Sequence, residues 1–275
     1  MKDLKDLKIY ISVDIEGTAG ICDWKETELG EQDYNYFQEE MIQETIACCE
    51  ALINKGITHI TVRDAHDSAR NIIPNRLPEE VTLIRGWTEG PCDMMAGLDN
   101  TYDGVIFIGY HSPARSIGNP LSHTLTTTLN HIKINGNIVS EFLLNTYYAQ
   151  TQYNVPVILL CGDNNLTNIV HSENIFIQTV STNTGLHGAV ITKHPNLVYK
   201  DIKEKTSKAV DMLASNPGQF FVKLPNHFDT EIHFRTHKRA YRASFYPNAH
   251  YLGNDKTVHH ADNFLDSLKF IMFTE

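Results

Sequence analysis

The chain has few of the features that mark secreted, membrane or nucleic-acid-binding proteins. Its 275 residues include five cysteines and no C-x-x-C pair, which excludes a zinc ribbon and a thioredoxin motif and favours reduced thiols in a cytoplasmic protein. No apolar run approaches the roughly 18 residues of a membrane span, and the run Ile9–Val13 is too short for a signal peptide. The net charge of −10 opposes binding to nucleic acid or to an anionic membrane surface.

Several catalytic signatures are also missing from the sequence. It contains no H-E-x-x-H, no G-x-S-x-G elbow, no Walker A sequence and no G-x-G-x-x-G. His171-Ser172-Glu173 resembles the start of a zinc deaminase signature, but Cys92 lies upstream of it and has no second cysteine beside it. These absences leave no support for a serine hydrolase, a P-loop enzyme or a nucleobase deaminase.

Strand and helix patterns alternate through the first two thirds of the chain. Residues 8–13 alternate apolar and polar side chains as a strand does, and residues 39–55 have the apolar spacing of an amphipathic helix that ends at Gly56. Asn135-Gly136 between two short apolar runs predicts a β-hairpin. Further elements are predicted as strands over 57–63, 81–85, 104–110 and 155–161 and as a helix over 140–153. This alternation predicts an α/β fold with a mostly parallel sheet flanked by helices.

The last third of the sequence is less regular. We predict a helix over residues 199–215, a strand-rich stretch over 219–246 and a closing helix over 262–273. We therefore expect an α/β domain over residues 1–190, which carries the candidate site, and a smaller strand-rich α+β portion over residues 191–275. No linker composition marks the boundary between them.

Carboxylate and imidazole side chains follow three of the predicted strands. Asp14 and Glu16 come after the first strand, Asp64 and His66 after the second, and His111 after the apolar strand 104–110. Ligands of open parallel sheets bind at the carboxyl ends of the strands, and oxygen and imidazole ligands suit Zn²⁺, Mn²⁺ or Fe²⁺. A single carboxylate after a strand is often only a helix cap or a turn residue. The joint placement is what predicts a metal site.

Five short segments then resemble one enzyme family. They are residues 8–17 (KIYISVDIEG), 63–66 (RDAH), 107–111 (FIGYH), 121–124 (LSHT) and 134–145, which runs from Ile-Asn-Gly to Glu-Phe-Leu-Leu-Asn. These segments resemble motifs of the binuclear zinc D-aminopeptidases of the bacterial dipeptide-permease type, and they occur in the same order. The first three resemble the opening motif and the second and third motifs of that family, the fourth its catalytic segment, and the fifth the segment with its last metal ligand. The match extends over about residues 8–165. Each motif is short, and the set of five is specific.

The resemblance implies a binuclear zinc aminopeptidase that acts on small peptides or aminoacyl amides with an N-terminal D-amino acid. It implies two Zn²⁺ per subunit and a homo-oligomer, a decamer of stacked pentameric rings. His123 would be the catalytic residue. Asp14 would bridge the two ions, Glu16 and His111 would complete one site, and His66 and Glu141 would complete the other.

The sequence departs from the family pattern at two places. The stretch between His111 and Leu121 is one residue longer than usual, and Ser140 stands where the family commonly has glycine. The loop is expected to line the substrate pocket, so the first departure bears on substrate choice.

Asp64 is expected either to accept a hydrogen bond from a ligating imidazole or to cap a turn. His259 and His260 are expected to begin the closing helix in surface or capping roles.

Other functions remain open on sequence grounds. Arg63 and Arg115 are close in sequence to the candidate ligands, and a binuclear phosphoesterase would be expected to place basic side chains there. A non-peptide amidase would share the metal site. The non-enzymatic alternative is an oligomer that binds metal for structural or scavenging purposes, in which His123 would be a structural histidine.

Overall fold

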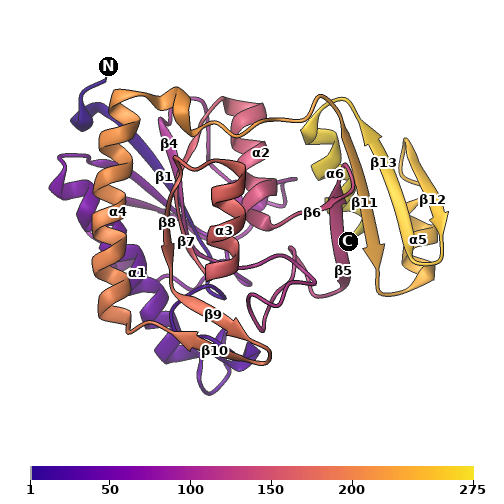
Figure 1. Cartoon of the computed structure of the whole chain (residues 1–275), viewed down its shortest axis with the longest axis horizontal. Coiled ribbons are helices and arrows are strands. Elements are labelled where there is room, and N and C mark those ends of the chain that lie inside the picture. The colour runs from indigo at the N-terminus through magenta and orange to yellow at the C-terminus, as the bar shows by residue number, and fades with distance from the viewer. Residues whose placement is uncertain (1) are drawn as a thin grey trace.

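Two sheets make up the framework of the protein. The structure, a computed structural model, describes residues 2–275 (Figure 1). The first sheet is parallel throughout, in the order β3-β2-β1-β4-β7-β8. Its strands are β1 (Lys8–Val13), β2 (His59–Asp64), β3 (Val81–Ile84), β4 (Gly104–Tyr110), β7 (Val157–Gly162) and β8 (Gln178–Ser181). The prediction of an α/β fold with a mostly parallel sheet is confirmed.

The second sheet is antiparallel, in the order β12-β13-β11-β5-β6. Its strands are β5 (Leu129–Ile134), β6 (Asn137–Ile138), β11 (Phe228–Phe234), β12 (Ala249–Gly253) and β13 (Lys256–Ala261). A separate ribbon pairs β9 (Asn183–Leu186) with β10 (Ala189–Thr192). The predicted hairpin at Asn135-Gly136 joins β5 to β6, and Gly136 takes the positive φ of 84° that such a turn requires.

Helices flank the first sheet and cover the second. They are α1 (Tyr34–Asn54), α2 (Glu141–Tyr153), α3 (Asn164–Glu173), α4 (Pro195–Ser215), α5 (His237–Ala243) and α6 (Phe264–Thr274). Single 3₁₀ turns span Leu4–Asp6, Trp24–Glu26, Pro74–Arg76, Asp93–Met95 and Pro217–Phe220. Helices α1 and α4 pack side by side, and α6 packs against α2 and β11 (Figure 1). No helix within residues 2–275 is long and apolar enough to cross a bilayer.

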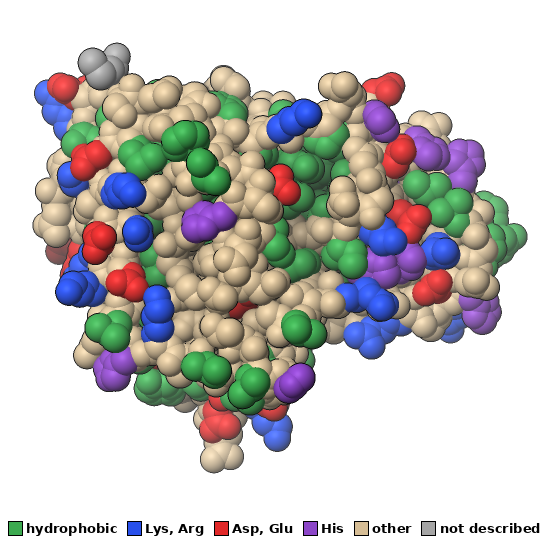
Figure 2. All heavy atoms as spheres, viewed as in Figure 1, with side chains coloured by type: hydrophobic (Ala, Val, Ile, Leu, Met, Phe, Trp, Pro, Cys, Tyr) green, Lys and Arg blue, Asp and Glu red, His purple; other side chains and the backbone are tan. Residues whose placement is uncertain are grey.

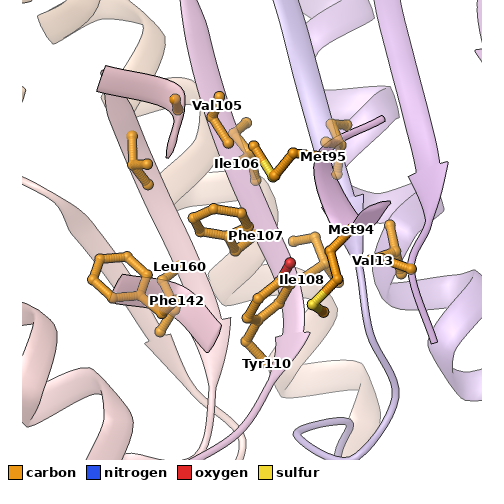
Figure 3. Packing of buried hydrophobic residues seen from close by; sticks show 14 of the residues in the cluster. Val13, Met94, Met95, Val105, Ile106, Phe107, Ile108, Tyr110, Phe142 and Leu160 are labelled. Carbon is orange, nitrogen blue, oxygen red and sulfur yellow. The ribbon is translucent and has the colours of Figure 1, made fainter. Parts of the chain in front are cut away.

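Strand β4 forms the centre of the core. All seven of its residues are buried, as expected of an apolar strand covered on both faces. Figure 3 shows Phe107 of β4 near Phe142 of α2. The two rings meet edge to face, with their centroids 5.7 Å apart. Burying these large side chains fixes β4 firmly, and with it the position of His111 at its carboxyl end.

Helix α1 begins five residues earlier than its apolar spacing predicts. Tyr34 in the first turn is buried, and its hydroxyl donates a hydrogen bond to Asn71 Oδ1 at 2.7 Å, so a tertiary contact holds this turn. The predicted end is confirmed. Gly56 has a φ of 84°, and the N–H of Ile57 donates to the carbonyl of Leu52 at 3.1 Å, which closes the helix with a left-handed glycine.

Two predictions for the last third are wrong in detail. Residues 219–246 contain one strand of the second sheet, β11, followed by helix α5 rather than by further strands. His259 and His260 lie in β13, and the closing helix α6 begins after them, where the side chain of Asn263 accepts a hydrogen bond from the N–H of Asp266. His259 is held in the strand because its ring stacks on Phe270 of α6 at 5.0 Å.

The second sheet draws strands from two distant parts of the chain. Strands β5 and β6 precede α2, whereas β11, β12 and β13 come from the last fifty residues. Helix α4, which follows residue 190, packs on α1 and the first sheet. Residues 1–190 therefore contribute strands to both sheets, and residues 191–275 contribute strands to the second sheet and a helix to the first. The expected division of the chain at residue 190 stays a prediction.

Candidate metal centre

The order of the parallel strands gathers the predicted side chains at one edge of the first sheet. Strand β1 lies between β2 and β4, so the residues that follow these three strands are spatial neighbours. Asp14 and Glu16 follow β1, His66 follows β2 and His111 follows β4. Glu141 is the first residue of α2 and reaches the same place from the hairpin of the second sheet. All five side chains are buried.

Two glycines let the loops that carry these residues pack backbone to backbone. The N–H of Gly17 donates to the carbonyl of Gly109 at 2.8 Å, and the N–H of Asp14 donates to Ile108 at 2.9 Å. A Cβ atom on Gly17 would lie 1.9 Å from the carbonyl oxygen of Tyr110, and one on Gly109 would lie 2.1 Å from that of Asp14. Any larger residue at either position would push the two loops apart.

Asp14 lies between two imidazoles and turns one oxygen to each. His66 Nδ1 is 3.2 Å from Asp14 Oδ1, and His111 Nε2 is 3.6 Å from Asp14 Oδ2. Glu16 Oε2 is 3.3 Å from His66 Nδ1, and Glu141 Oε2 is 3.4 Å from His111 Nε2. The chain turns directly after β1, and this turn brings Asp14 and Glu16 into one site.

The potential ligand atoms form three overlapping groups, each with all atoms within 4.8 Å of one another. The groups are Asp14, Glu16 and His66; Asp14, His111 and Glu141; and Glu16, His111 and His123. Asp14 belongs to two of them, as a bridging carboxylate would. The first group combines Glu16 with His66, and the second combines His111 with Glu141. The third brings Glu16 to His111, as the resemblance implied, whereas no group within residues 2–275 holds both His66 and Glu141.

Each imidazole is fixed by a backbone carbonyl through one ring nitrogen. His66 Nε2 lies 2.8 Å from the carbonyl of Thr27, His111 Nδ1 lies 2.9 Å from that of Ser112, and His123 Nδ1 lies 2.8 Å from that of Leu121. Since a carbonyl can only accept, these nitrogens carry the proton and donate. The opposite nitrogen of each ring then faces the carboxylates, which is the usual arrangement of metal-binding histidines.

Burial and close contact shift the pKa values of the groups in the cluster. Burial and the neighbouring Glu16 raise the pKa of Asp14 well above its ordinary value. Burial alone would lower the pKa of His66 and His111, but the facing carboxylates outweigh it and raise both pKa values well above the usual range. Glu16 Oε2 and His111 Nε2 are buried without a hydrogen-bond partner. Carboxylate oxygens, imidazole nitrogens and these two unpartnered atoms fit divalent cations such as zinc.

His123 lies over the cluster and closes it towards the cavity. Its ring stacks on His111 with centroids 4.3 Å apart and meets Trp24 edge to face at 5.2 Å. His123 Nε2 is 3.7 Å from Glu141 Oε1 and 3.9 Å from Glu16 Oε1. Burial, and after it the charge of His111, lower the pKa of His123 below its ordinary value. A lowered pKa favours the neutral ring, in which Nε2 can accept a proton.

Leu125 and Asp64 support the cluster from outside it. Leu125 takes a φ of 64°, and in this conformation its N–H donates to Glu141 Oε1 at 2.6 Å.

Asp64 accepts hydrogen bonds from the backbone N–H groups of Asn71 and Ile72 at 2.6 and 2.7 Å, so of its two expected roles the turn cap is observed. It still acts on His66 indirectly, because Asn71 Nδ2 donates both to Asp64 and to the carbonyl of His66.

The two arginines considered for anion binding have different surroundings. Arg63 is fully buried, with its Nε and Nη1 donating to the carbonyls of Asp93 and Gly86 and its guanidinium 4.7 Å from the centroid of Trp87. It therefore fixes the segment after β3 and does not line the cavity. Arg115 is exposed and does line it.

A cavity of about 1020 Å³ opens above the cluster. All six predicted site residues except His111 line it, and His111 lies directly behind His123. Sequence reasoning missed Trp24, Arg235 and a wall of α6 formed by Leu268, Ile271 and Met272. None of these is near a candidate ligand in sequence except Trp24, one of two tryptophans in the chain, which could have been noticed for its position after the first motif.

Comparisons with known proteins point to one family. The family model described as D-aminopeptidase matches residues 7–273. A D-aminopeptidase of Bacillus subtilis (strain 168) is 36% identical over 157 residues, which are 57% of this chain and 56% of that relative, so the aligned region spans about half of its length. The solved structure of a Zn-dependent D-aminopeptidase from Bacillus subtilis, described as a self-compartmentalizing protease, superposes with a TM-score of 0.88 at 26% identity and covers 98% of this chain and 96% of that chain.

Proposed function

This chain belongs to the D-aminopeptidase family, and from that premise we propose that it is a zinc-dependent aminopeptidase that hydrolyses short peptides or aminoacyl amides with an N-terminal D-amino acid. The observation that carries the proposal is Asp14, which presents one carboxylate oxygen to each of two imidazole-carboxylate groups at the floor of the cavity. This arrangement suits two cations bridged by one carboxylate.

We propose Asp14, Glu16, His66, His111 and Glu141 as the ligands of two Zn²⁺ per subunit. Zinc, when bound, supplies Lewis acidity to polarise the scissile carbonyl and lowers the pKa of the attacking water. The residues themselves orient the ligand atoms, because two carbonyls fix the imidazoles of His66 and His111 and the N–H of Leu125 fixes Glu141.

His123 is proposed as the catalytic residue. Its Nδ1–H is engaged by the Leu121 carbonyl, and its Nε2 faces the cavity side of the cluster near Glu16 and Glu141. Because its pKa is lowered by burial and by His111, Nε2 is free to accept a proton at neutral pH and to deliver it to the leaving amine. Stacking between His111 and Trp24 holds the ring in place for this transfer.

The phosphoesterase alternative is not favoured. The family comparison points to peptidases, and Arg63 is used by backbone carbonyls rather than presented to the cavity.

A homo-oligomer is proposed as the working form, a decamer of stacked pentameric rings in the cytoplasm. The related zinc enzyme is described as self-compartmentalizing. An aromatic patch on this chain is formed by Tyr241, Phe245 and Tyr251, which are 57%, 73% and 42% exposed and pack on one another. Exposed patches of this kind mark contact surfaces. Light scattering coupled to gel filtration measures the number of subunits, and a monomer would contradict this part of the proposal.

The activity is tested with the zinc-loaded protein on matched panels of D- and L-aminoacyl amides, dipeptides and phosphate esters. We expect turnover of the D-aminoacyl compounds and none of the esters. A His123→Ala variant should keep its zinc and lose about 10²- to 10⁴-fold in kcat, since general acid–base groups contribute this much. His260→Ala, at an exposed histidine of the second sheet, is the control. Turnover of phosphate esters alone, or an unchanged His123→Ala variant, would contradict the proposal.

A further inference from the structure

The cavity above the metal centre is lined by charged side chains of both signs. The loops after β2 and β3 contribute the carboxylates of Asp67, Glu89 and Asp93, which form an acidic wall, whereas the loop after β4 and the residue after β11 contribute Arg115 and Arg235. Glu28 and Glu275 also line the cavity. Because β1 lies between β2 and β4 in the sheet, the loops after β2 and β3 and the loop after β4 flank the cluster on opposite sides.

The acidic wall is held together by its own hydrogen bonds. Trp87 Nε1 donates to the carbonyl of Asp67 at 2.7 Å, and the N–H of Thr88 donates to Asp93 Oδ1 at 3.0 Å. Beneath it, Arg63 binds the carbonyls at both ends of this segment. The wall therefore presents carboxylates from a fixed loop rather than from a loose one.

The two arginines lie on the same side of the cavity. Strand β11 pairs with β5 as far as Phe234, and Arg235 is the next residue. Arg115 lies on the same side, because the N–H of the preceding residue, Ala114, donates to Thr124 Oγ1 at 3.2 Å, in the segment that leads into β5. Figure 2 shows several Lys, Arg and His side chains over this part of the molecule, where the second sheet lies in Figure 1.

Both guanidinium groups are unpaired. Among the described residues, the arginines whose side chains make hydrogen bonds or ion pairs are Arg63, Arg76 and Arg85. No lysine of residues 2–275 lines the cavity, so Arg115 and Arg235 are its free cations. Arg115 also takes a φ of 66°, a backbone conformation that a bulky residue rarely adopts and that tends to occur at ligand-binding sites.

We infer that Arg115 and Arg235 bind the C-terminal carboxylate of the peptide, so that the preferred substrates are short peptides with a free carboxyl terminus rather than aminoacyl amides. The inference rests on the proposed function and names its substrate class. A short peptide is a zwitterion, and its ammonium end suits the carboxylates of the opposite wall. The planar fork of each guanidinium matches a carboxylate in two parallel hydrogen bonds, which a neutral C-terminal amide cannot accept in the same way.

The experiment compares a dipeptide of D-amino acids with its C-terminal amide, using the zinc-loaded protein. We expect a higher kcat/KM for the free acid. Arg115→Ala and Arg235→Ala should each raise KM for the acid about tenfold and leave the constants for the amide unchanged, and Arg235→Lys should fall between. Arg242→Ala is the matched control, because Arg242 is exposed on the neighbouring helix α5 and does not line the cavity.

A binding measurement separates this inference from the activity itself. In the His123→Ala background, calorimetry should give an about tenfold higher Kd for the dipeptide when either arginine is also replaced, with no change for the amide. If acid and amide are hydrolysed equally and the arginine variants are unaffected, the inference is overturned and the proposed function stands. If neither compound is hydrolysed but the arginine variants still weaken binding of the acid, the proposed function fails and the carboxylate site remains.

Discussion

At the scale of single residues, Asp14 is the side chain that connects the two halves of the proposed metal centre. It contacts two imidazoles through separate oxygens, and its N–H is tied to the backbone of β4, so neither position nor direction is free to vary. Its side chain also accepts from the N–H of Ile15 at 2.9 Å. Of the other proposed ligands, His66 and Glu141 each belong to a single group of potential ligand atoms.

Replacing Asp14 should therefore remove both metal ions rather than one. We expect Asp14→Ala to retain little or no zinc by elemental analysis after dialysis, because each half of the site loses a carboxylate and the bridge between them disappears. Asp67→Ala removes an exposed carboxylate from the same cavity and should keep the full zinc content. Full zinc in a folded Asp14→Ala protein, checked by circular dichroism, would contradict the bridging role.

The sequence contains enough information to predict where these residues lie, and the reason is physical. Parallel strands end at one edge, so Asp14, His66 and His111 could be placed together from their positions after three strands. The family resemblance added Glu141 and His123, and the match of the family model over residues 7–273 confirms that resemblance. Arg235 could not be found in this way, because its place in the cavity wall depends on how β11 pairs with β5.

At the scale of elements, the start of α2 determines where Glu141 points. Ser140 is the N-cap of this helix, and its hydroxyl accepts a hydrogen bond from the N–H of Leu143 at 3.2 Å. Glu141, as the first helical residue, lies at the positive end of the helix dipole, which favours a carboxylate there. The serine at this position, in place of the glycine common in the family, is a better cap in hydrogen-bonding terms.

Removing this cap should cost stability by a predictable amount. We expect Ser140→Ala to lower the free energy of unfolding by about 1 kcal/mol and Ser140→Gly by only a few tenths, since glycine tolerates the cap conformation. Urea unfolding of the metal-free proteins measures both values. Ser172→Ala, at an exposed serine within α3, serves as the control and should change stability little. Equal losses for alanine and glycine would show that the hydroxyl of Ser140 does not act as a cap.

The long elements could be predicted from periodicity, and the short ones only where an apolar run or a turn sequence marks them. Strand β4 and helices α1 and α4 have enough apolar residues in register for the pattern to determine them. Helix α5 has seven residues, and the strand that holds His259 depends on stacking with Phe270, which is a tertiary contact. Elements fixed by such contacts lack a local signal.

At the scale of the whole molecule, stability should depend on pH through a buried carboxyl group far from the proposed ligands in sequence. Glu44 on α1 is fully buried, accepts a hydrogen bond from the N–H of Ala19 at 2.9 Å and lies 3.7 Å from Cys161 Sγ. It thus joins α1 to the loop after Glu16 and to β7. Burial raises its pKa to about 8.

The sign of the effect follows from which state holds the proton. An unfolded chain releases the Glu44 proton near pH 4.3, whereas the folded protein keeps it until about pH 8. Between these values the unfolded state binds fewer protons, so the free energy of unfolding falls as pH rises, by at most about 1.4 kcal/mol per pH unit from this group. The stabilising contribution is complete below the unfolded pKa and is lost as pH rises through the folded one.

Glu44→Gln keeps the shape and the acceptor for the Ala19 N–H but cannot titrate. We measure the free energy of unfolding of both proteins in urea at pH 5, 6, 7 and 8, in the presence of a chelator. We expect the value for Glu44→Gln minus the value for the natural protein to increase at each step towards pH 8. Taking the difference between the two proteins cancels the titration of the metal cluster, which both share. Glu50→Gln, at a partly exposed carboxylate on the same helix that pairs with Lys203, is the control and should give a difference that does not change with pH in this range. Parallel stability curves for Glu44→Gln and the natural protein would show that Glu44 is already ionised in the folded state.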